Sequence, residues 1–348
     1  MTRFLMLRRS VSISASVHSS ASIPVFTTIK DYRLWRNEAF ESKKSVGFVP
    51  TMGALHDGHL SLVKRSLSEN DLTVVSIFVN PSQFAPHEDL ATYPRTLPQD
   101  LILLSALEYQ PANPPNAPRT PSAVFLPSVK DMYPSGISQD VSQQKGTFVE
   151  VKGYGEQMEG LSRPTFFRGV ATIVTKLFNI IQPTNAYFGQ KDIQQALLLR
   201  RLVGDLHFSH PTHDNLHIIP TARNAANGLA LSSRNVYLTP CERRLAPTLY
   251  AALQDAGQVW AAGASKQEAV RRALDRLGAA KDEGAKDGIE IRVDYVEMND
   301  PDTFEVLGDG QVQRSDGAPV ILSGAAWFGR TRLIDNVILG NLEGIVAK

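Results

Sequence analysis

Short apolar runs alternate with amphipathic segments between Ser45 and Pro220. The run LTVVSIFVN (72–80) is apolar at nearly every position, which is typical of a parallel strand buried on both faces. The predicted strands are 45–50, 72–80, 123–127, 185–190 and 216–220, and the predicted helices are 60–70, 96–109, 166–183 and 193–206. This alternation predicts an α/β fold, with a parallel sheet covered by helices on both faces.

The pattern changes after about residue 220. Two helical stretches come first and two β-rich stretches follow, which predicts a smaller α+β domain. The helical stretches are 241–263 and 266–278, and the β-rich stretches are 289–298 and 319–339. We therefore expect an N-terminal extension (1–24), a parallel-sheet domain (25–220) and a C-terminal domain (221–348).

Composition narrows the class of protein. The 348 residues suffice for one large domain or two ordinary ones. The formal net charge of +1 gives no indication of a nucleic-acid partner. Cys241 is the single cysteine, so no intrachain disulfide can form, and no cluster has zinc-ligand spacing. No apolar run approaches the roughly 18 residues of a membrane-spanning helix, so we expect no membrane partner.

The first thirty residues differ from the rest of the chain. They contain Arg3, Arg8, Arg9 and many serines, and the first acidic residue is Asp31. This composition is typical of a mitochondrial transit peptide. The alternative is a disordered extension without a targeting role. We therefore expect a mitochondrial or a cytoplasmic protein.

The stretch VPTMGALHDGH (49–59) joins a predicted strand to a predicted helix. In an open α/β sheet, ligands bind where strands give way to helices. Free N–H groups at a helix N-terminus favour phosphate, and histidines such as His56 and His59 can be cationic near neutral pH. The stretch predicts a nucleotide site. The alternative is a surface turn that contains histidine by chance.

Two further strand ends carry polar side chains. Asn80 and Gln83 follow the strand 72–80, and a neutral amide there can bind hydroxyls and carboxylates. Lys191 follows the strand 185–190 and can neutralise phosphate oxygens. The alternatives are an Asn-Pro turn in the first case, and in the second a helix cap beside a solvated lysine.

The stretch NGLALSSRN (227–235) brings two hydroxyls beside a guanidinium. Ser232, Ser233 and Arg234 could together bind the β and γ phosphates of a nucleotide as pyrophosphate leaves. The alternative is a polar loop between two domains.

Six stretches, in this order, resemble the pantothenate synthetase (pantoate–β-alanine ligase) family. They are PTMGALHDGH, SIFVNPSQF, YPRTLPQDL, FFRGVATIVTKLFN, FGQKDIQQ and GLALSSRN. The resemblance covers roughly residues 26–340, and HDGH resembles the HxGH motif of a wider adenylylating superfamily. It implies a Rossmann-like nucleotide-binding domain followed by a smaller lid domain.

The resemblance also implies a reaction. The carboxylate of D-pantoate attacks the α-phosphate of Mg·ATP, which gives pantoyl adenylate and pyrophosphate. The amine of β-alanine then attacks the acyl carbon, which gives pantothenate and AMP. ATP is a substrate, Mg²⁺ is the metal, and a homodimer is expected from the family.

Residue roles follow from the matching motif positions. The implied catalytic residues are His59, His56, Lys191 and Arg234. The implied ATP-binding residues are Met52, Gly53, Ala54, Leu55, His56, Asp57, Gly58, His59, Gly189, Gln190, Lys191, Asp192, Leu231, Ser232, Ser233 and Arg234. Pantoate is expected at Gln83, Gln195 and Asn80, β-alanine at Gln83, and Mg²⁺ at Asp100.

The chain departs from the family pattern before the two serines. The run RNAANG (223–228) has one extra residue, and Asn227 stands where the family usually has an acid. Asparagine favours left-handed turns, so we expect the backbone to be kept. The lost carboxylate could alter lid closure or the pairing of Arg223. Gln190 replaces a common glutamate, and we expect little effect.

Three other functions remain open at this stage. A nucleotidyltransferase of the same superfamily would need Arg or Lys for a phosphate acceptor, whereas Gln83 and Gln195 suit a neutral pocket. A weakened metabolite-binding or scaffold protein is supported only by the altered run 223–228. An aminoacyl-tRNA synthetase is disfavoured because the chain is short and nearly neutral.

Overall fold

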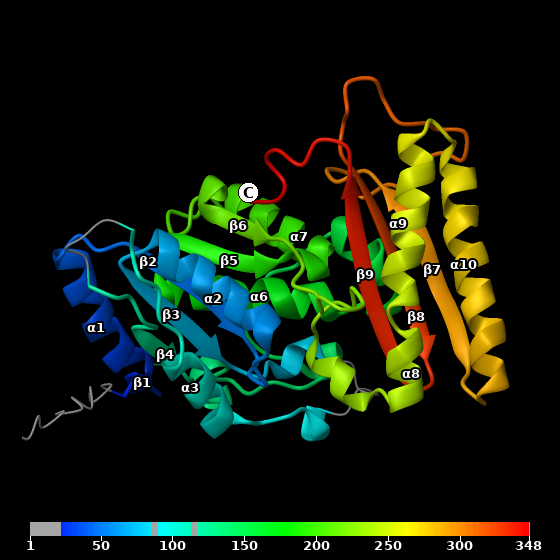
Figure 1. The fold of residues 1–348 in the computed structure, drawn as a ribbon. Helices are drawn as coiled ribbons and strands as arrows, with labels where there is room; N and C mark the ends of the chain where they lie inside the picture. Colours follow the sequence, from blue (N-terminus) through cyan, green and yellow to red (C-terminus); the bar gives the residue numbers. More distant parts are fainter. Residues whose placement is uncertain (1–21, 85–89, 113–116, 348) are drawn as a thin grey trace, which may run out of the picture.

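The structure, a computed structural model, describes residues 22–84, 90–112 and 117–347 (Figure 1). The transit-peptide hypothesis concerns a segment that lies outside these residues, apart from its last three. None of the helices in the described ranges combines the length and hydropathy that a membrane crossing requires.

A parallel sheet forms the centre of the first part of the molecule. In spatial order its six described strands are β1 (Val25–Phe26), β4 (Ala123–Phe125), β3 (Leu72–Ile77), β2 (Val46–Thr51), β5 (Asn185–Gly189) and β6 (Leu216–Ile219). The chain leaves β2 toward β3 and β4 on one side, and later continues to β5 and β6 on the other. The boundary between β2 and β5 is therefore a topological switch point, where open α/β sheets bind ligands.

Helices cover both faces of this sheet, as the alternation predicted. The helices are α1 (Ile29–Glu41), α2 (Asp57–Glu69), α3 (Leu97–Ser105), α4 (Val129–Met132), α5 (Glu159–Ser162), α6 (Phe166–Ile181) and α7 (Ile193–Asp205). Successive strand residues point to opposite faces. Phe48 packs in the core with α1, α6 and α7, whereas its neighbour Val49 packs in the core with α2 and α3. The pattern gave no expectation for β1 and α1.

An antiparallel sheet forms the second part. Its described strands are β7 (Ile291–Asn299), β8 (Val320–Phe328) and β9 (Thr331–Leu339), in that order, and its helices are α8 (Pro240–Leu245), α9 (Thr248–Ala261) and α10 (Lys266–Lys286). These elements share a separate core. Figure 1 shows α9 and α10 side by side along this sheet.

The predicted α+β arrangement is confirmed, with two corrections to its helices and one refinement of a β-rich stretch. The helix predicted over 241–263 is two helices, because Pro247 lacks the N–H that a continuous helix needs. The helix predicted over 266–278 continues to Lys286. The stretch 319–339 is a hairpin that turns at Gly329, which has a φ of 58°.

The C-terminal tail returns to the parallel sheet. The Ala347 N–H donates to the Ile218 carbonyl over 2.8 Å, and Ile345 joins the core of the first part. We propose that the two domains meet near residue 220, as predicted. We also propose that the contacts of this tail hold the end of the second domain against the first.

Candidate active site

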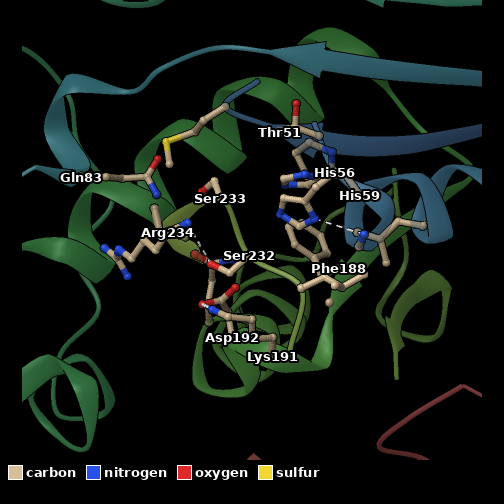
Figure 2. Close-up of a pocket in the computed structure, with 18 of the residues that line it drawn as sticks. Thr51, His56, His59, Gln83, Phe188, Lys191, Asp192, Ser232, Ser233 and Arg234 are labelled. Carbon is tan, nitrogen blue, oxygen red and sulfur yellow. Dashed lines mark hydrogen bonds and ion pairs between the residues drawn. The ribbon is translucent and has the colours of Figure 1, made fainter. Parts of the chain in front are cut away.

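A pocket of about 480 Å³ opens at the switch point of the parallel sheet. All four predicted stretches contribute to its lining (Figure 2). The predicted residues that line it are Met52, His56, Gly58, His59, Gln83, Gly189, Lys191, Asp192, Gln195, Leu231, Ser232, Ser233 and Arg234. The structure therefore brings most of the predicted site residues together.

The turn after β2 adopts an uncommon backbone. Gly53 and Ala54 both have positive φ, 86° and 50°. The buried carboxylate of Asp100 accepts from the Ala54 N–H over 3.1 Å and from the Leu55 N–H over 2.8 Å. A Cβ on residue 53 would lie 3.2 Å from Asp100 Oδ2. Gly53, Ala54 and Leu55 thus shape the turn rather than line the pocket.

This geometry also corrects the prediction of a Mg²⁺ ligand on α3. Asp100 is 1% exposed and its oxygens face N–H and O–H donors of the protein, so we do not retain it as a Mg²⁺ ligand. Thr96 stands at the N-cap position of the helix. Its hydroxyl, however, donates to Asp100 Oδ1 over 3.2 Å instead of capping the backbone.

His56 caps helix α2. Its Nδ1 accepts from the Gly58 N–H over 3.1 Å, so the neutral ring carries its proton on Nε2. A Cβ on residue 58 would lie 2.7 Å from the His56 ring, so glycine is required there by close approach. Burial, and then the charge of Lys191, lowers the pKa of His56.

His59 lies against His56, with the ring centroids 4.1 Å apart. Its buried Nδ1 finds no hydrogen-bond partner among the residues that the structure describes. Burial, and then His56, lowers the pKa of His59 to about 3. Burial therefore favours the neutral form of both histidines in the ligand-free protein. A bound triphosphate would oppose this shift, because a nearby negative charge favours the imidazolium.

Lys191 stands at the end of β5, across the switch point from His56. Its ammonium is 3.7 Å from Asp192 Oδ1, and its side chain is 17% exposed. Asp192 makes no side-chain capping bond to α7, so the helix-cap alternative is not supported. Gln190 turns away from the pocket, and its Nε2 donates to Asn336 Oδ1 over 3.2 Å.

Asn80 positions Gln83 and does not line the pocket. Its Nδ2 donates to Gln83 Oε1 over 2.9 Å and to the Gly169 carbonyl over 3.2 Å. Its Oδ1 accepts from Tyr133 over 2.7 Å. Direct pantoate binding by Asn80 is therefore replaced by a supporting role. Because Gln83 Oε1 is an acceptor in this contact, its Nε2 remains the donor for a ligand.

The loop that follows β6 forms the opposite wall of the pocket. Ser232 Oγ accepts from the Arg234 N–H over 3.3 Å and so caps a short 3₁₀ helix, η7 (Ser233–Tyr237). Tyr93 and Ser233 both line the pocket beside it. The wall thus carries two hydroxyls and a guanidinium toward the cavity, as predicted.

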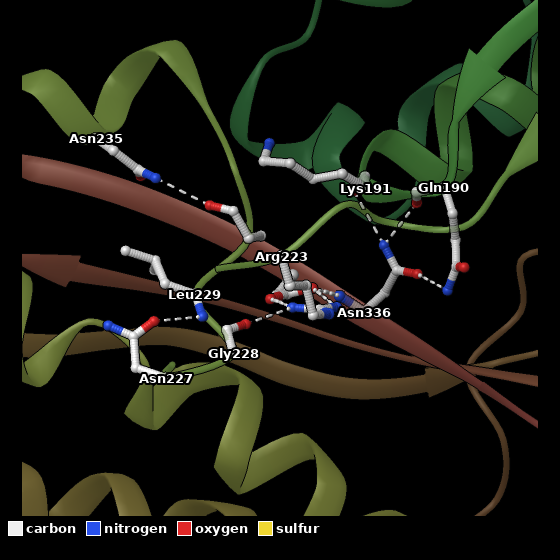
Figure 3. A network of polar contacts seen from close by, with 10 residues as sticks. Gln190, Lys191, Arg223, Asn227, Gly228, Leu229, Asn235 and Asn336 are labelled. Carbon is white, nitrogen blue, oxygen red and sulfur yellow. Dashed lines mark hydrogen bonds and ion pairs between the residues drawn. The ribbon is translucent and has the colours of Figure 1, made fainter. Parts of the chain in front are cut away.

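The altered run 223–228 keeps an ordered turn (Figure 3). Asn227 Oδ1 accepts from the Leu229 N–H over 3.1 Å, and Gly228 rather than Asn227 has the positive φ, 77°. Arg223 pairs with both oxygens of Asp335, over 2.6 and 2.8 Å. The carboxylate partner of Arg223 therefore comes from β9, and the substitution at residue 227 leaves this pairing intact.

Several lining residues were not predicted. Arg163 donates to the Gln83 carbonyl over 3.0 Å and stacks on Phe166 at 3.9 Å, yet it lies in a stretch without a regular pattern. Tyr93 belongs to the YPRT motif, which suggested no role for it. Ala222 lines the pocket ahead of the altered run.

The part of the chain that the structure describes contains no magnesium site built wholly from protein. No group of three or more His, Cys, Asp and Glu side chains within the described ranges could hold a metal ion. Asp192 is a half-exposed carboxylate on the pocket wall. The residues present therefore fit a Mg²⁺ ion held mainly by nucleotide phosphates, which is common for this cation.

A model of the family described as pantoate-beta-alanine ligase matches residues 24–338. The chain belongs to the pantoate–β-alanine ligase family. The pantoate–β-alanine ligase of Saccharomyces cerevisiae is 40% identical over 90% of this chain and 99% of the yeast protein. The pantothenate synthetase of Moorella thermoacetica is 44% identical over 90% of this chain and 97% of that protein.

Solved structures agree with this assignment. Pantothenate synthetase from Thermus thermophilus matches with a TM-score of 0.72 and 40% identity, over 90% of this chain and 99% of that one. The Francisella tularensis ligase, complexed with β-γ ATP and β-alanine, matches with a TM-score of 0.64 and 32% identity, over 91% of this chain and 97% of that one. The predicted fold and ligase activity in pantothenate biosynthesis are confirmed, in place of the nucleotidyltransferase and tRNA-synthetase alternatives.

Proposed function

We propose that this pocket activates D-pantoate with ATP and then transfers the pantoyl group to β-alanine. The observation that carries the proposal is the switch-point cavity itself. It joins a helix N-terminus with two histidines, a lysine, a serine–serine–arginine wall and two neutral glutamines. ATP and β-alanine are bound by the Francisella relative, and the same substrates suit this cavity.

The triphosphate would lie between the two walls. On one side, the α2 N-terminus offers a positive dipole end, and His56 and His59 line the cavity beside it. On the other side, Ser232, Ser233 and Arg234 would hold the β and γ phosphates. Mg²⁺, when bound with ATP, would neutralise phosphate charge beside Asp192.

Adenylation would place a pantoate carboxylate oxygen in line with the α-phosphorus. A bond forms between these two atoms, the bond to the bridging oxygen of pyrophosphate breaks, and the electron pair leaves with pyrophosphate. Negative charge grows on the phosphoryl oxygens, where Lys191 and His59 can stabilise it. No protein atom becomes covalently bound.

The second half-reaction would take place beside Gln83. Gln83 and Gln195 are neutral and can hold the hydroxyls and carboxylate of pantoate. The guanidinium of Arg163, next to Gln83, is suited to the carboxylate of β-alanine. The β-alanine amine attacks the acyl carbon, AMP leaves, and the amine proton passes to solvent or to the departing phosphate.

We propose a homodimer on the basis of the resemblance. We propose a mitochondrial or cytoplasmic location on the basis of the N-terminal composition. Light scattering of the purified protein would measure the mass in solution. The mature N-terminus of the protein taken from cells would show whether the segment before residue 25 is removed.

The test of the proposed function is the release of AMP and pyrophosphate by the purified protein with Mg·ATP, D-pantoate and β-alanine. We expect multiple-turnover AMP and pantothenate only when all three substrates are present. Binding of ATP without AMP in any combination would contradict the proposal and support the metabolite-binding alternative.

A further inference from the structure

Two adjacent buried residues of β9 contact segments of the chain that lead into the pocket. Asp335 is 5% exposed and Asn336 is 2% exposed, although they lie within an otherwise apolar stretch. Neither residue lines the pocket. The Asn336 side chain instead contacts the backbone of Gln190 and Lys191 (Figure 3). The Asp335 carboxylate pairs with the side chain of Arg223, which lies ahead of the Ser232–Arg234 loop.

Asn336 holds the segment that carries Lys191. Its Nδ2 donates to the Gln190 carbonyl over 2.9 Å and to the Lys191 carbonyl over 3.0 Å. Its Oδ1 accepts from Gln190 Nε2 over 3.2 Å. An amide has two donor hydrogens, and here both are directed at successive carbonyls of one turn. This arrangement fixes the backbone from which the Lys191 side chain projects.

Asp335 holds the segment that leads to Ser232–Arg234. It pairs with both terminal nitrogens of Arg223, and Arg223 Nη1 also donates to the Gly228 carbonyl over 3.2 Å. The aromatic ring of Tyr250 lies 3.4 Å from the Arg223 guanidinium carbon. Bidentate pairing of this kind fixes orientation as well as distance.

The two contacts are linked to each other. The main-chain N–H of Asn336 donates to Asp335 Oδ1 over 2.8 Å, so the Asp335 carboxylate is held by the backbone of the residue that carries the Asn336 side chain. A displacement of β9 would therefore move both phosphate-facing segments together.

We propose that Asn336 and Asp335 are positioning residues that set the spacing between the Lys191 segment and the Ser232–Arg234 loop. The proposal rests on the function proposed above, in which both segments contact the triphosphate. It makes the second sheet a determinant of adenylation geometry, acting through hydrogen bonds to main-chain carbonyls and to Arg223.

The primary test is Asn336→Asp, which preserves side-chain shape but replaces the two-hydrogen donor with an oxygen facing carbonyls. We expect kcat for adenylate formation to fall about 10- to 100-fold, because misplacement of catalytic groups by about 1 Å has effects of this size. The KM for pantoate should change by less than about threefold, since Gln83 and Gln195 are untouched.

The matched control is Tyr295→Phe. This change also removes one hydrogen bond between the second sheet and the first part of the chain, because the Tyr295 hydroxyl donates to Glu159 Oε1 over 2.8 Å. It touches neither phosphate-facing segment. We expect its thermal midpoint to fall while kcat stays within about twofold of wild type.

A double mutant separates positioning from general destabilisation. In a Lys191→Ala background, Asn336→Asp should reduce adenylate formation by no more than about a further twofold, because residues that act together are not additive. Independent, multiplicative losses would overturn the proposal. So would equal kinetic effects of Asn336→Asp and Tyr295→Phe.

Gln190→Ala keeps the proposal testable if Asn336→Asp does not fold. It removes one bond to Asn336 at a half-buried position, and we expect a smaller loss of kcat in the same direction. A wild-type kcat in Gln190→Ala would then overturn the proposal. The proposed ligase function has its own test. It would be contradicted if the wild-type protein itself released no AMP with all three substrates.

Discussion

The two walls of the pocket are held in different ways. The turn 52–59 is fixed from within the first domain by Asp100, against a strained backbone at Gly53 and Ala54. The loop 222–234 is fixed from outside it, through the pair formed by Arg223 and Asp335. The turn 52–59 is therefore preorganised and is called the fixed wall. The position of the loop 222–234, called the dependent wall, depends on the second sheet.

This difference assigns different tasks to the walls. The fixed wall contains His56 and His59, whose donors must already be in place as charge develops on the α-phosphate. The dependent wall contains Ser232–Arg234, which must admit and release a triphosphate. Changes in the first should therefore affect chemistry most directly, and changes in the second should be milder or depend on β9.

His59→Ala should give one of the largest losses. Removing a donor at developing charge typically costs about 100- to 1000-fold in rate, and we expect this loss in single-turnover pantoyl-adenylate formation. His213→Ala, at a half-exposed histidine distant from the pocket lining, is the matched control. Near-normal adenylate formation in His59→Ala would remove this residue from the mechanism.

Lys191→Ala should lose at least about 100-fold in the same assay, because a cation facing the phosphates is removed. Lys281→Ala, an exposed lysine of α10, controls for the loss of one positive charge. Equal rates of adenylate formation in the two variants would contradict a phosphate contact. They would support the alternative in which Lys191 is a solvated side chain.

Asp100→Ala should loosen the fixed wall. Two backbone N–H groups lose their charged acceptor, so we expect the free energy of unfolding to fall by about 1.5–3 kcal/mol, as measured by urea denaturation. Adenylate formation should fall as well, with Mg²⁺ dependence unchanged. The exposed Asp275 provides the control Asp275→Ala. A shifted Mg²⁺ dependence in Asp100→Ala would restore this residue as a metal ligand.

The ligand-free protein should lose stability as the pH falls. Burial lowers the pKa of His59 to about 3 and also lowers the pKa of His56, so the unfolded chain binds more protons below the ordinary histidine pKa of 6.5. The contribution of these two histidines to the free energy of unfolding is therefore complete above about pH 6.5. It is lost progressively as the pH falls toward 3.

Urea midpoints measured at pH values of about 7.5, 6.5 and 5.5 would determine this slope. His59→Gln should have a shallower slope than wild type, since one of the depressed groups is gone. A stability that is constant or rises toward pH 5.5 would contradict the neutral state assigned to the histidines.

Asn227→Asp should have the smallest effect. A carboxylate can accept from the Leu229 N–H as the amide oxygen does, and residue 227 is exposed. We expect kcat to change by no more than about twofold, and the free energy of unfolding by no more than about 0.5 kcal/mol. A large gain in kcat would show that the altered run limits closure of the dependent wall after all.

The strands and the fixed wall were the most predictable features, because their signals are local. Consecutive apolar residues identified β2, β3 and β5, and the residues after two of these strands carried the histidines and Lys191. The Asp100 contact was missed because it joins residues 45 positions apart in the chain. Asp335 and Asn336 were visible as a polar pair inside an apolar strand, but only the packing of the two domains shows what they contact.

Pantoate-dependent exchange of labelled pyrophosphate into ATP, without β-alanine, tests most directly whether this pocket forms a pantoyl adenylate between its two walls. We predict exchange in the wild-type protein with pantoate, none without it, and a loss of at least about 100-fold in Lys191→Ala. A wild-type protein that makes pantothenate from all three substrates but shows no such exchange would contradict the account.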